Sequence, residues 1–225
     1  MPSSELAHFL NVAIDIQAPP FAGVHVDDGV MAATDGVMLV TKKFDDKVFL
    51  RGRGSISPKA ARVLEALAAE TWIGSIEVSG NRVSVTAQGT WFDEKIGAEM
   101  AGAYREVTLP EFYCPRVPIA RMLAVLTDES RGWQQIVENP NLKALKEMSV
   151  RDYVALVDDP RDGGELFRPK ADGDECWYSV RQLREGLRLF RARDTVSVFR
   201  NDQGWLSFRD DWGRLFAVTP FVKRD

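Results

Sequence analysis

The stretch VRQLREGLRLFRARD, residues 180–194, places arginine at positions 181, 184, 188, 191 and 193. The first four arginines follow one another at intervals of 3, 4 and 3 residues, which is the spacing of one face of an α-helix. We therefore expect a helix over 179–193, with Leu183, Leu187 and Phe190 facing the sheet. The basic face has two interpretations: a solvated surface, or a surface that meets phosphate groups.

The composition is that of a folded soluble protein, with 45% hydrophobic and 28% charged residues in 225. The net charge of -4 and the pI near 5.4 argue against coating of nucleic acid by the whole surface, but they permit a local basic stripe. Neither Cys114 nor Cys176 belongs to a CxxC pair, so we expect no disulfide framework and no zinc site. We also expect no signal peptide, no membrane partner and a cytoplasmic location.

Hydrophobic periodicity predicts an α+β fold. Helices are expected at 3–15, 57–70, 119–126 and 179–193. Strands are expected at 23–28, 30–35, 37–44, 75–80, 81–88, near 90–99, and at 151–159, 195–199, 205–208 and 214–218.

The two halves of the chain repeat one pattern of helix, strands, helix and strands. Lys59 and Arg62 lie two and five residues after Ser57, and Arg181 and Arg184 lie two and five residues after Ser179, which is 122 residues further on. Such an internal match indicates two related domains. We place them at 1–108 and 109–225, and interpret 128–150 as a partly helical insertion in the second.

Three segments in order resemble the DNA sliding clamp family: GVMAATDGVMLV at 29–40, EMAGAYREVTLP at 99–110 and RLFAVTPF at 214–221. The resemblance implies two clamp-like domains, each with two helices on one face of antiparallel sheets, in a protein that forms a ring. Two domains per chain imply a homotrimer, because three chains restore a six-domain ring. A homodimer or a monomer is the alternative.

The resemblance also implies a processivity factor that encircles duplex DNA without sequence preference and tethers a DNA polymerase. Such a protein performs no bond chemistry and needs no cofactor or metal. Its cations should attract phosphates without reading bases. The expected DNA-binding residues are Lys59, Arg62, Arg121, Arg181, Arg184, Arg188 and Arg191.

The first helix departs from this pattern. Its expected outward face carries no lysine or arginine and consists of Glu5, His8, Asn11, Val12 and Asp15. Clamp domains usually open with a strand, whereas at most five residues precede this helix. Both observations favour an alternative function, a clamp-fold module that binds partner peptides without encircling DNA.

The resemblance further implies a pocket for short apolar peptides of the polymerase and the clamp loader. Its expected residues are Thr34, Leu39, Pro110, Val218, Pro220 and Phe221. Thr219 and Phe221 stand where bacterial clamps usually have methionine, so the peptide preference should differ. For Leu39 and Val218, an ordinary place in the core is the competing interpretation.

An enzyme is the remaining alternative, and a nuclease is its most plausible form. The sequence contains no GxSxG, GxxxxGK[ST] or GxGxxG motif. His25 and Asp27 share one face of a predicted strand, but two ligands make no metal site. We therefore expect a protein that is not an enzyme.

Overall fold

The computed structural model describes residues 3–16, 21–44, 49–80, 82–93, 98–109, 119–128, 131–138, 142, 166–167 and 178–220. The chain divides into two compact units. The first unit holds Met1–Asp35 and Thr41–Ala120, and the second holds Gly36–Val40 and Arg121–Asp225. Because residues 110–118 lie outside the described ranges, the boundary expected near residue 108 stays a prediction.

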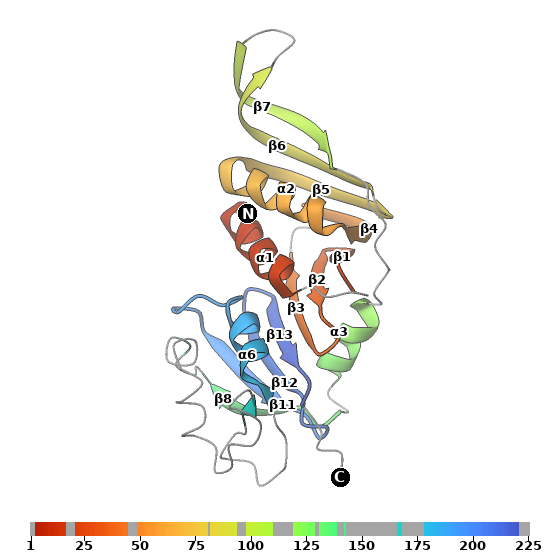
Figure 1. The fold of residues 1–225 in the computed structure, drawn as a ribbon, viewed down its shortest axis with the longest axis vertical. Coiled ribbons are helices and arrows are strands. Elements are labelled where there is room, and N and C mark those ends of the chain that lie inside the picture. Colours follow the sequence, from red (N-terminus) through yellow and green to blue (C-terminus); the bar gives the residue numbers. More distant parts are fainter. Residues whose placement is uncertain are drawn as a thin grey trace. The chain divides into compact units, whose positions relative to one another are not determined.

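The fold is α+β, as the sequence predicts (Figure 1). The helices of the described part are α1 (Ser3–Ile16), α2 (Pro58–Glu70), α3 (Ile119–Thr127) and α6 (Val180–Leu187). The first unit contains strands β1 (Val24–Asp27), β2 (Val30–Thr34), β4 (Leu50–Ile56), β5 (Trp72–Gly80), β6 (Arg82–Asp93) and β7 (Ala98–Thr108). The second contains β8 (Gln134–Glu138), β9 (Leu166–Phe167), β10 (Tyr178–Ser179), β11 (Val196–Arg200), β12 (Leu206–Asp210) and β13 (Arg214–Val218), and β3 (Met38–Lys43) passes from it into the first. None of the helices in these described ranges is long and apolar enough to cross a membrane.

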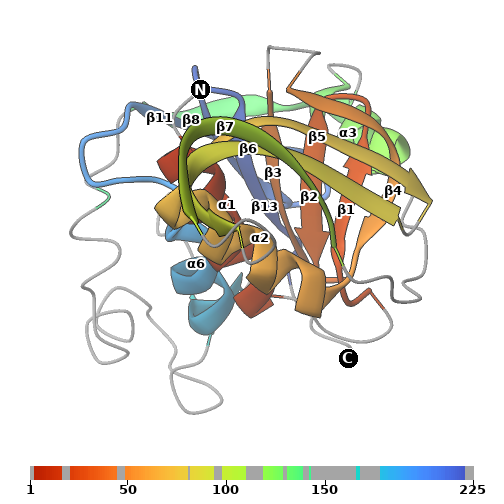
Figure 2. The same cartoon turned by 90° about the horizontal axis from the view of Figure 1, so that it is seen from above.

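Helices α1 and α2 pack against each other on one face of the first unit's sheet (Figure 2). The residues of α1 that are expected to face inward are all buried, namely Leu6, Phe9, Leu10 and Ala13. The Ser3 hydroxyl accepts a hydrogen bond of 2.9 Å from the Ile73 N–H, which ties the start of α1 to β5. The helical periodicity of the sequence therefore identifies the buried face of α1 correctly.

The sheet of the first unit is mixed, whereas the sequence-based expectation is an antiparallel one. Its strands follow the order β7-β6-β5-β4-β1-β2, and β4 pairs with β5 in parallel. Helix α2 connects these two strands, since a parallel pair requires a crossover. A Cβ atom at Gly54 of β4 would lie 1.9 Å from the carbonyl oxygen of Gly80, so glycine permits the close approach of β4 to β5.

The strands of the second unit follow the order β3-β13-β12-β11-β8, and the pairs β13–β12, β12–β11 and β11–β8 are antiparallel. Strands β11, β12 and β13 confirm three of the expected strands and the two turns between them. Strand β8 lies inside the segment 128–150 and pairs with β11, so this part of the expected insertion belongs to the sheet and is not helical. The strand expected at 151–159 lies outside the described residues.

Candidate nucleic-acid interface

Helix α2 presents two cations beside a serine cap. The Ser57 hydroxyl accepts a hydrogen bond of 3.1 Å from the Ala60 N–H, which satisfies one of the free donors at the helix start. Lys59 and Arg62 are exposed, and Leu64 is buried on the opposite side. The helix therefore holds its two cations toward solvent, as the sequence predicts.

Helix α6 begins in the same way. The Ser179 hydroxyl accepts a hydrogen bond of 3.3 Å from the Gln182 N–H. Arg181 is exposed and forms an ion pair with Glu185 one turn later, with 3.0 Å between Nε and Oε1, whereas Arg184 is half-buried. In each unit, a serine-capped helix thus carries basic residues two and five positions after its cap.

The end of α6 corrects the sequence-based expectation. The helix ends at Leu187 and not at residue 193, and Arg188 is its C-cap. Arg191 therefore lies beyond the helix, and the four arginines do not form one helical face. We call residues 188–194, which follow the helix, the arginine turn.

Buried side chains explain why the helix ends there. Leu189 and Phe190 are both fully buried, so the chain turns toward the core where the expected helix would continue. The N–H groups of Leu189 and Phe190 donate to the carbonyls of Gly186 and Leu187, at 3.1 and 3.2 Å, which gives the tighter bonding of a turn. Residues on either side of this buried pair remain exposed.

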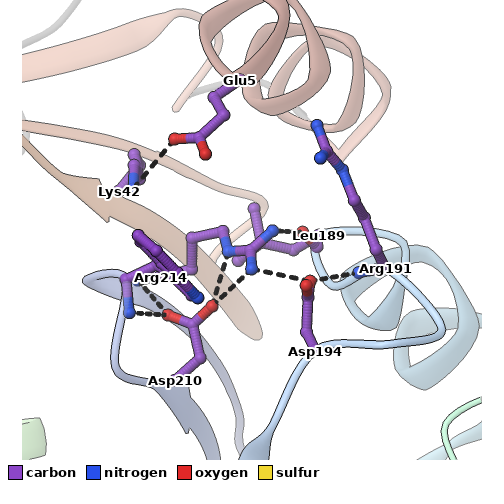
Figure 3. Close-up of polar contacts among 8 residues, drawn as sticks. Glu5, Lys42, Leu189, Arg191, Asp194, Asp210 and Arg214 are labelled. Carbon is purple, nitrogen blue, oxygen red and sulfur yellow. Dashed lines mark hydrogen bonds and ion pairs between the residues drawn. The ribbon is translucent and has the colours of Figure 1, made fainter. Parts of the chain in front are cut away.

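Arg214 of β13 ties the arginine turn to the sheet (Figure 3). Its Nη2 lies 2.6 Å from a carboxylate oxygen of Asp194 and 2.6 Å from one of Asp210. Its Nη1 donates to the Leu189 carbonyl at 3.3 Å, and the Arg191 N–H donates to Asp194. One guanidinium group thus fixes the turn at two points, a backbone carbonyl and a carboxylate.

Helix α3 carries the exposed Arg121 and is fixed at its C-terminal end. The Arg209 guanidinium donates to the Leu126 carbonyl at 2.5 Å and lies over the rings of Trp133 and Phe199, 5.1 and 4.4 Å from their centroids. Burial lowers the pKa of Arg209 from its ordinary value. Donors at a helix C-terminus satisfy free carbonyls and complement the helix dipole, so this contact orients α3.

Helix α1 contains no lysine or arginine. Asn11 and Asp15 are exposed as expected, but Val12 is buried, which corrects the outward face predicted from the sequence. Glu5 forms an ion pair with the buried Lys42 of β3 at 3.7 Å. This helix therefore offers polar and acidic groups to solvent, but no cation.

The expected peptide pocket is only partly within the described residues. Thr34, Leu39 and Val218 are buried, and Pro220 is half-buried. Leu39 and Val218 lie on the neighbouring strands β3 and β13, so both contribute to the core of the second unit. The remaining two residues, Pro110 and Phe221, lie outside the described ranges.

His25 is buried, and both of its ring nitrogens lie within hydrogen-bond distance of other protein groups. Its Nδ1 lies 2.9 Å from the Ser55 hydroxyl, and its Nε2 lies 3.3 Å from the Phe21 carbonyl oxygen. Burial lowers the pKa of His25, and the hydrogen bond with the Phe21 carbonyl partly offsets this effect. In the part of the chain that the structure describes, no three His, Cys, Asp or Glu side chains gather as metal ligands would.

Sequence reasoning did not identify the residues that organise the arginine turn. Asp194, Asp210 and Arg214 are not part of the predicted basic face, and Arg193 was not among its expected contacts. Asp210 and Arg214 are four residues apart at the two ends of a turn, which is a weak signal of a pair. Nothing in the sequence indicates that Asp194 reaches the same guanidinium.

Comparison with known proteins identifies the fold. No protein-family model matches the chain, and no curated protein matches it. The DNA polymerase sliding clamp of Pseudomonas aeruginosa matches 99% of this chain and 66% of its own length, with a TM-score of 0.62 and 14% identity. The DNA polymerase III beta subunit of Thermotoga maritima gives a TM-score of 0.61 at 12% identity, and the sliding clamp of Bacillus subtilis gives 0.56 at 14%.

These matches cover 99% or 100% of this chain but only 64% to 66% of the solved clamps. The chain thus spans slightly less than two thirds of their length. The resemblance that the sequence motifs indicate is confirmed as a resemblance of fold: the chain has the bacterial sliding-clamp fold along its whole length.

Proposed function

We propose that this chain is a DNA sliding clamp that encircles duplex DNA and tethers a DNA polymerase as a processivity factor. One observation carries the proposal: in each unit of a clamp fold, a serine-capped helix holds cations at the same two positions after its cap. These cations are Lys59 and Arg62 in α2, and Arg181 and Arg184 in α6.

The chemistry of such a surface suits sliding. Lysine and arginine attract phosphates by charge, and phosphate contacts carry no sequence information. Binding through phosphates alone should be weak, independent of sequence and strongly dependent on salt. A protein of this kind tracks along the duplex, because no base is gripped.

The test is fluorescence anisotropy with two duplexes of unrelated sequence and equal length. We expect equal affinity for both, and a loss of about tenfold or more in the paired variants Lys59→Glu/Arg62→Glu and Arg181→Glu/Arg184→Glu. The matched control is Arg51→Glu/Arg82→Glu, which reverses two exposed charges on strands β4 and β6. An equal loss in the control would mean that net charge alone decides binding, and would contradict the proposed interface.

The ring is proposed from length and fold. The chain spans about two thirds of the solved clamps, and the resemblance implies that three two-domain chains close one ring. We therefore propose a homotrimer, with a homodimer or a monomer as the alternative. A clamp loader is then the expected second partner, since a closed ring must open to admit DNA.

We also propose that the polymerase and loader dock beside β13. Pro220 follows this strand half-buried, and Phe221 comes next in the sequence. Because Val218 is buried within β13, a deletion that tests the pocket should begin after Pro220. Removing 221–225, or Phe221→Ala alone, should abolish binding of the terminal peptide of the cognate polymerase, and full retention of affinity would place the pocket elsewhere.

One observation favours the alternative of a peptide-binding module that does not encircle DNA. Helix α1 exposes Asn11 and Asp15 and contains no cation, so it would add repulsion to a DNA channel. Peptide binding by a chain that shows no salt-dependent affinity for either duplex would support this alternative.

A further inference from the structure

The arginine turn presents three cations on a short, anchored segment. Arg188, Arg191 and Arg193 are exposed, whereas Leu189 and Phe190 between them are fully buried. The buried pair anchors the backbone to the core, whereas the arginine side chains are accessible to solvent. This segment differs from a flexible basic loop, because the backbone that carries the three arginines is held in place by its buried neighbours.

The anchor of this turn is a buried ion network. The Arg214 side chain is 10% exposed, and the side chains of Asp194 and Asp210 are 14% and 0% exposed. Both Nε and Nη2 of Arg214 lie 2.6 Å from the same oxygen of Asp210, Oδ2, and the Arg214 backbone N–H donates to the other oxygen, Oδ1, at 2.8 Å. The Nη2 atom of Arg214 also forms an ion pair with Asp194. Because Arg214 belongs to β13, this strand fixes the position of the Asp194 carboxylate.

Asp194 in turn fixes the backbone of the arginine turn. It lies directly after Arg193, and its carboxylate accepts a hydrogen bond from the Arg191 N–H. The Asp194 N–H in turn donates to the Arg191 carbonyl at 3.1 Å, which closes the turn. The backbone of Arg191 and Arg193 is therefore held before any ligand binds, which reduces the entropy cost of binding.

We propose that Arg191 and Arg193 contact phosphates of duplex DNA, and that Arg214, acting through Asp194, is their positioning residue. This inference rests on the proposed function and extends it from the helices to the arginine turn. The ligand class is the sugar-phosphate backbone, because exposed guanidinium groups on a turn match phosphate oxygens in charge and geometry.

The sign of one substitution separates positioning from simple charge. Asp194→Asn removes a negative charge, so electrostatics alone predicts tighter binding to DNA. If Asp194 positions the arginines, the same change releases the turn from Arg214 and weakens binding. Asp211→Asn is the matched control, because Asp211 is exposed on the turn between β12 and β13 and the charge change is identical.

The experiment measures how the association constant for a duplex depends on salt. The slope of log K against log [salt] falls by about 0.9 for each phosphate contact that is lost. We expect Arg191→Gln and Arg193→Gln each to lower the slope by about that amount, and Asp194→Asn to lower it although this change removes a negative charge. Asp211→Asn and Arg82→Gln should leave the slope unchanged, since both residues lie outside the arginine turn.

Thermal unfolding of each variant separates local release from global unfolding. Arg191→Gln and Arg193→Gln change exposed side chains, so they carry the test even if Asp194→Asn fails to fold. Unchanged slopes in both arginine variants, beside a lowered slope in Lys59→Gln, would overturn this inference and leave the proposed function intact. A wild-type chain that binds neither duplex would overturn both.

Discussion

The Nη2 atom of Arg214 lies 2.6 Å from a carboxylate oxygen of Asp194, so a residue of strand β13 holds the turn that follows helix α6. The contact joins residues from different elements of the second unit and fixes the chain where the predicted helix does not continue. The basic surface of this unit is therefore composed of a short helix and an anchored turn.

The pair between Glu5 and Lys42 gives a prediction on stability. Lys42 is buried, so Glu5→Ala leaves its ammonium group without this carboxylate and should lower the free energy of unfolding by about 1–3 kcal/mol. Glu5→Ala/Lys42→Met, which replaces the pair by an apolar side chain, should recover most of this loss. Urea unfolding checks both variants, and equal loss in the single and double variants would contradict the explanation.

The contact between Gly186 and Phe216 gives a prediction on packing. A Cβ atom at Gly186 would lie 2.1 Å from the Phe216 ring, so Gly186→Ala must displace a fully buried side chain. Overpacking of this kind costs about 1–3 kcal/mol, which exceeds the gain of roughly 1 kcal/mol from the better helix propensity of alanine. We expect a lower melting temperature.

A second variant tests the cause of that loss. Phe216→Leu makes room beside α6, so Gly186→Ala should cost less in its presence than in the wild-type chain. Additive losses in the double variant would show that Phe216 is not the obstacle.

His25 predicts a dependence of stability on pH. Its folded-state pKa is lowered from the ordinary value of 6.5 by burial, so the unfolded chain takes up a proton first as the pH falls. The stabilising contribution is complete above the unfolded pKa, and is lost as the pH falls through the folded pKa. Urea unfolding between about pH 8 and pH 5 should show a steeper loss in the wild type than in His25→Gln.

The control for this prediction is His8→Gln, because His8 lies half-exposed on α1. In this variant the loss of stability that depends on His25 should remain. At about pH 8, His25→Gln should also be less stable by about 1–2 kcal/mol, because it loses the hydrogen bond with Ser55. Parallel stability curves for the wild type and His25→Gln would contradict the assignment.

Sequence patterns predicted the helix starts well and one helix end poorly. Ser57 and Ser179 act as caps because a hydroxyl before a helix satisfies free N–H groups, and this rule depends only on local sequence. The end of α6 depends on tertiary packing, since Leu189 and Phe190 are buried against the rest of the unit. The helical spacing of the arginines continues to Arg191, although the helix itself ends at Leu187. The spacing alone therefore predicts too long a helix.

Strand β4 and the pocket residues show two further limits. The segment LRGRGSI at 50–56 lacks alternation, because its glycines serve a close parallel pairing with β5 that is not visible locally. Leu39 and Val218 are buried. The sequence pattern of an apolar strand residue is the same whether the side chain faces a core or a binding groove, so it cannot distinguish the two. The fold could thus be predicted from ordered motifs, whereas the contacts of single side chains could not.

The proposed homotrimer predicts a mass in solution. Light scattering after size-exclusion chromatography should give three times the chain mass of 25.2 kDa at the higher protein concentrations. A closed six-domain ring requires this stoichiometry if each chain contributes two domains. A mass of two chains at every concentration would exclude the three-chain ring.

The most direct test of the central claim is retention of the protein on a nicked circular duplex at high salt, measured before and after a single-cut enzyme linearises the DNA. High salt removes binding that depends on phosphate contacts alone, so retention then reports encirclement. We expect retention on the circle and loss after cutting, because a ring slides off a free end. Equal retention before and after linearisation, or no retention on the circle when the cognate clamp loader is present, would contradict the proposal that the chain encircles DNA.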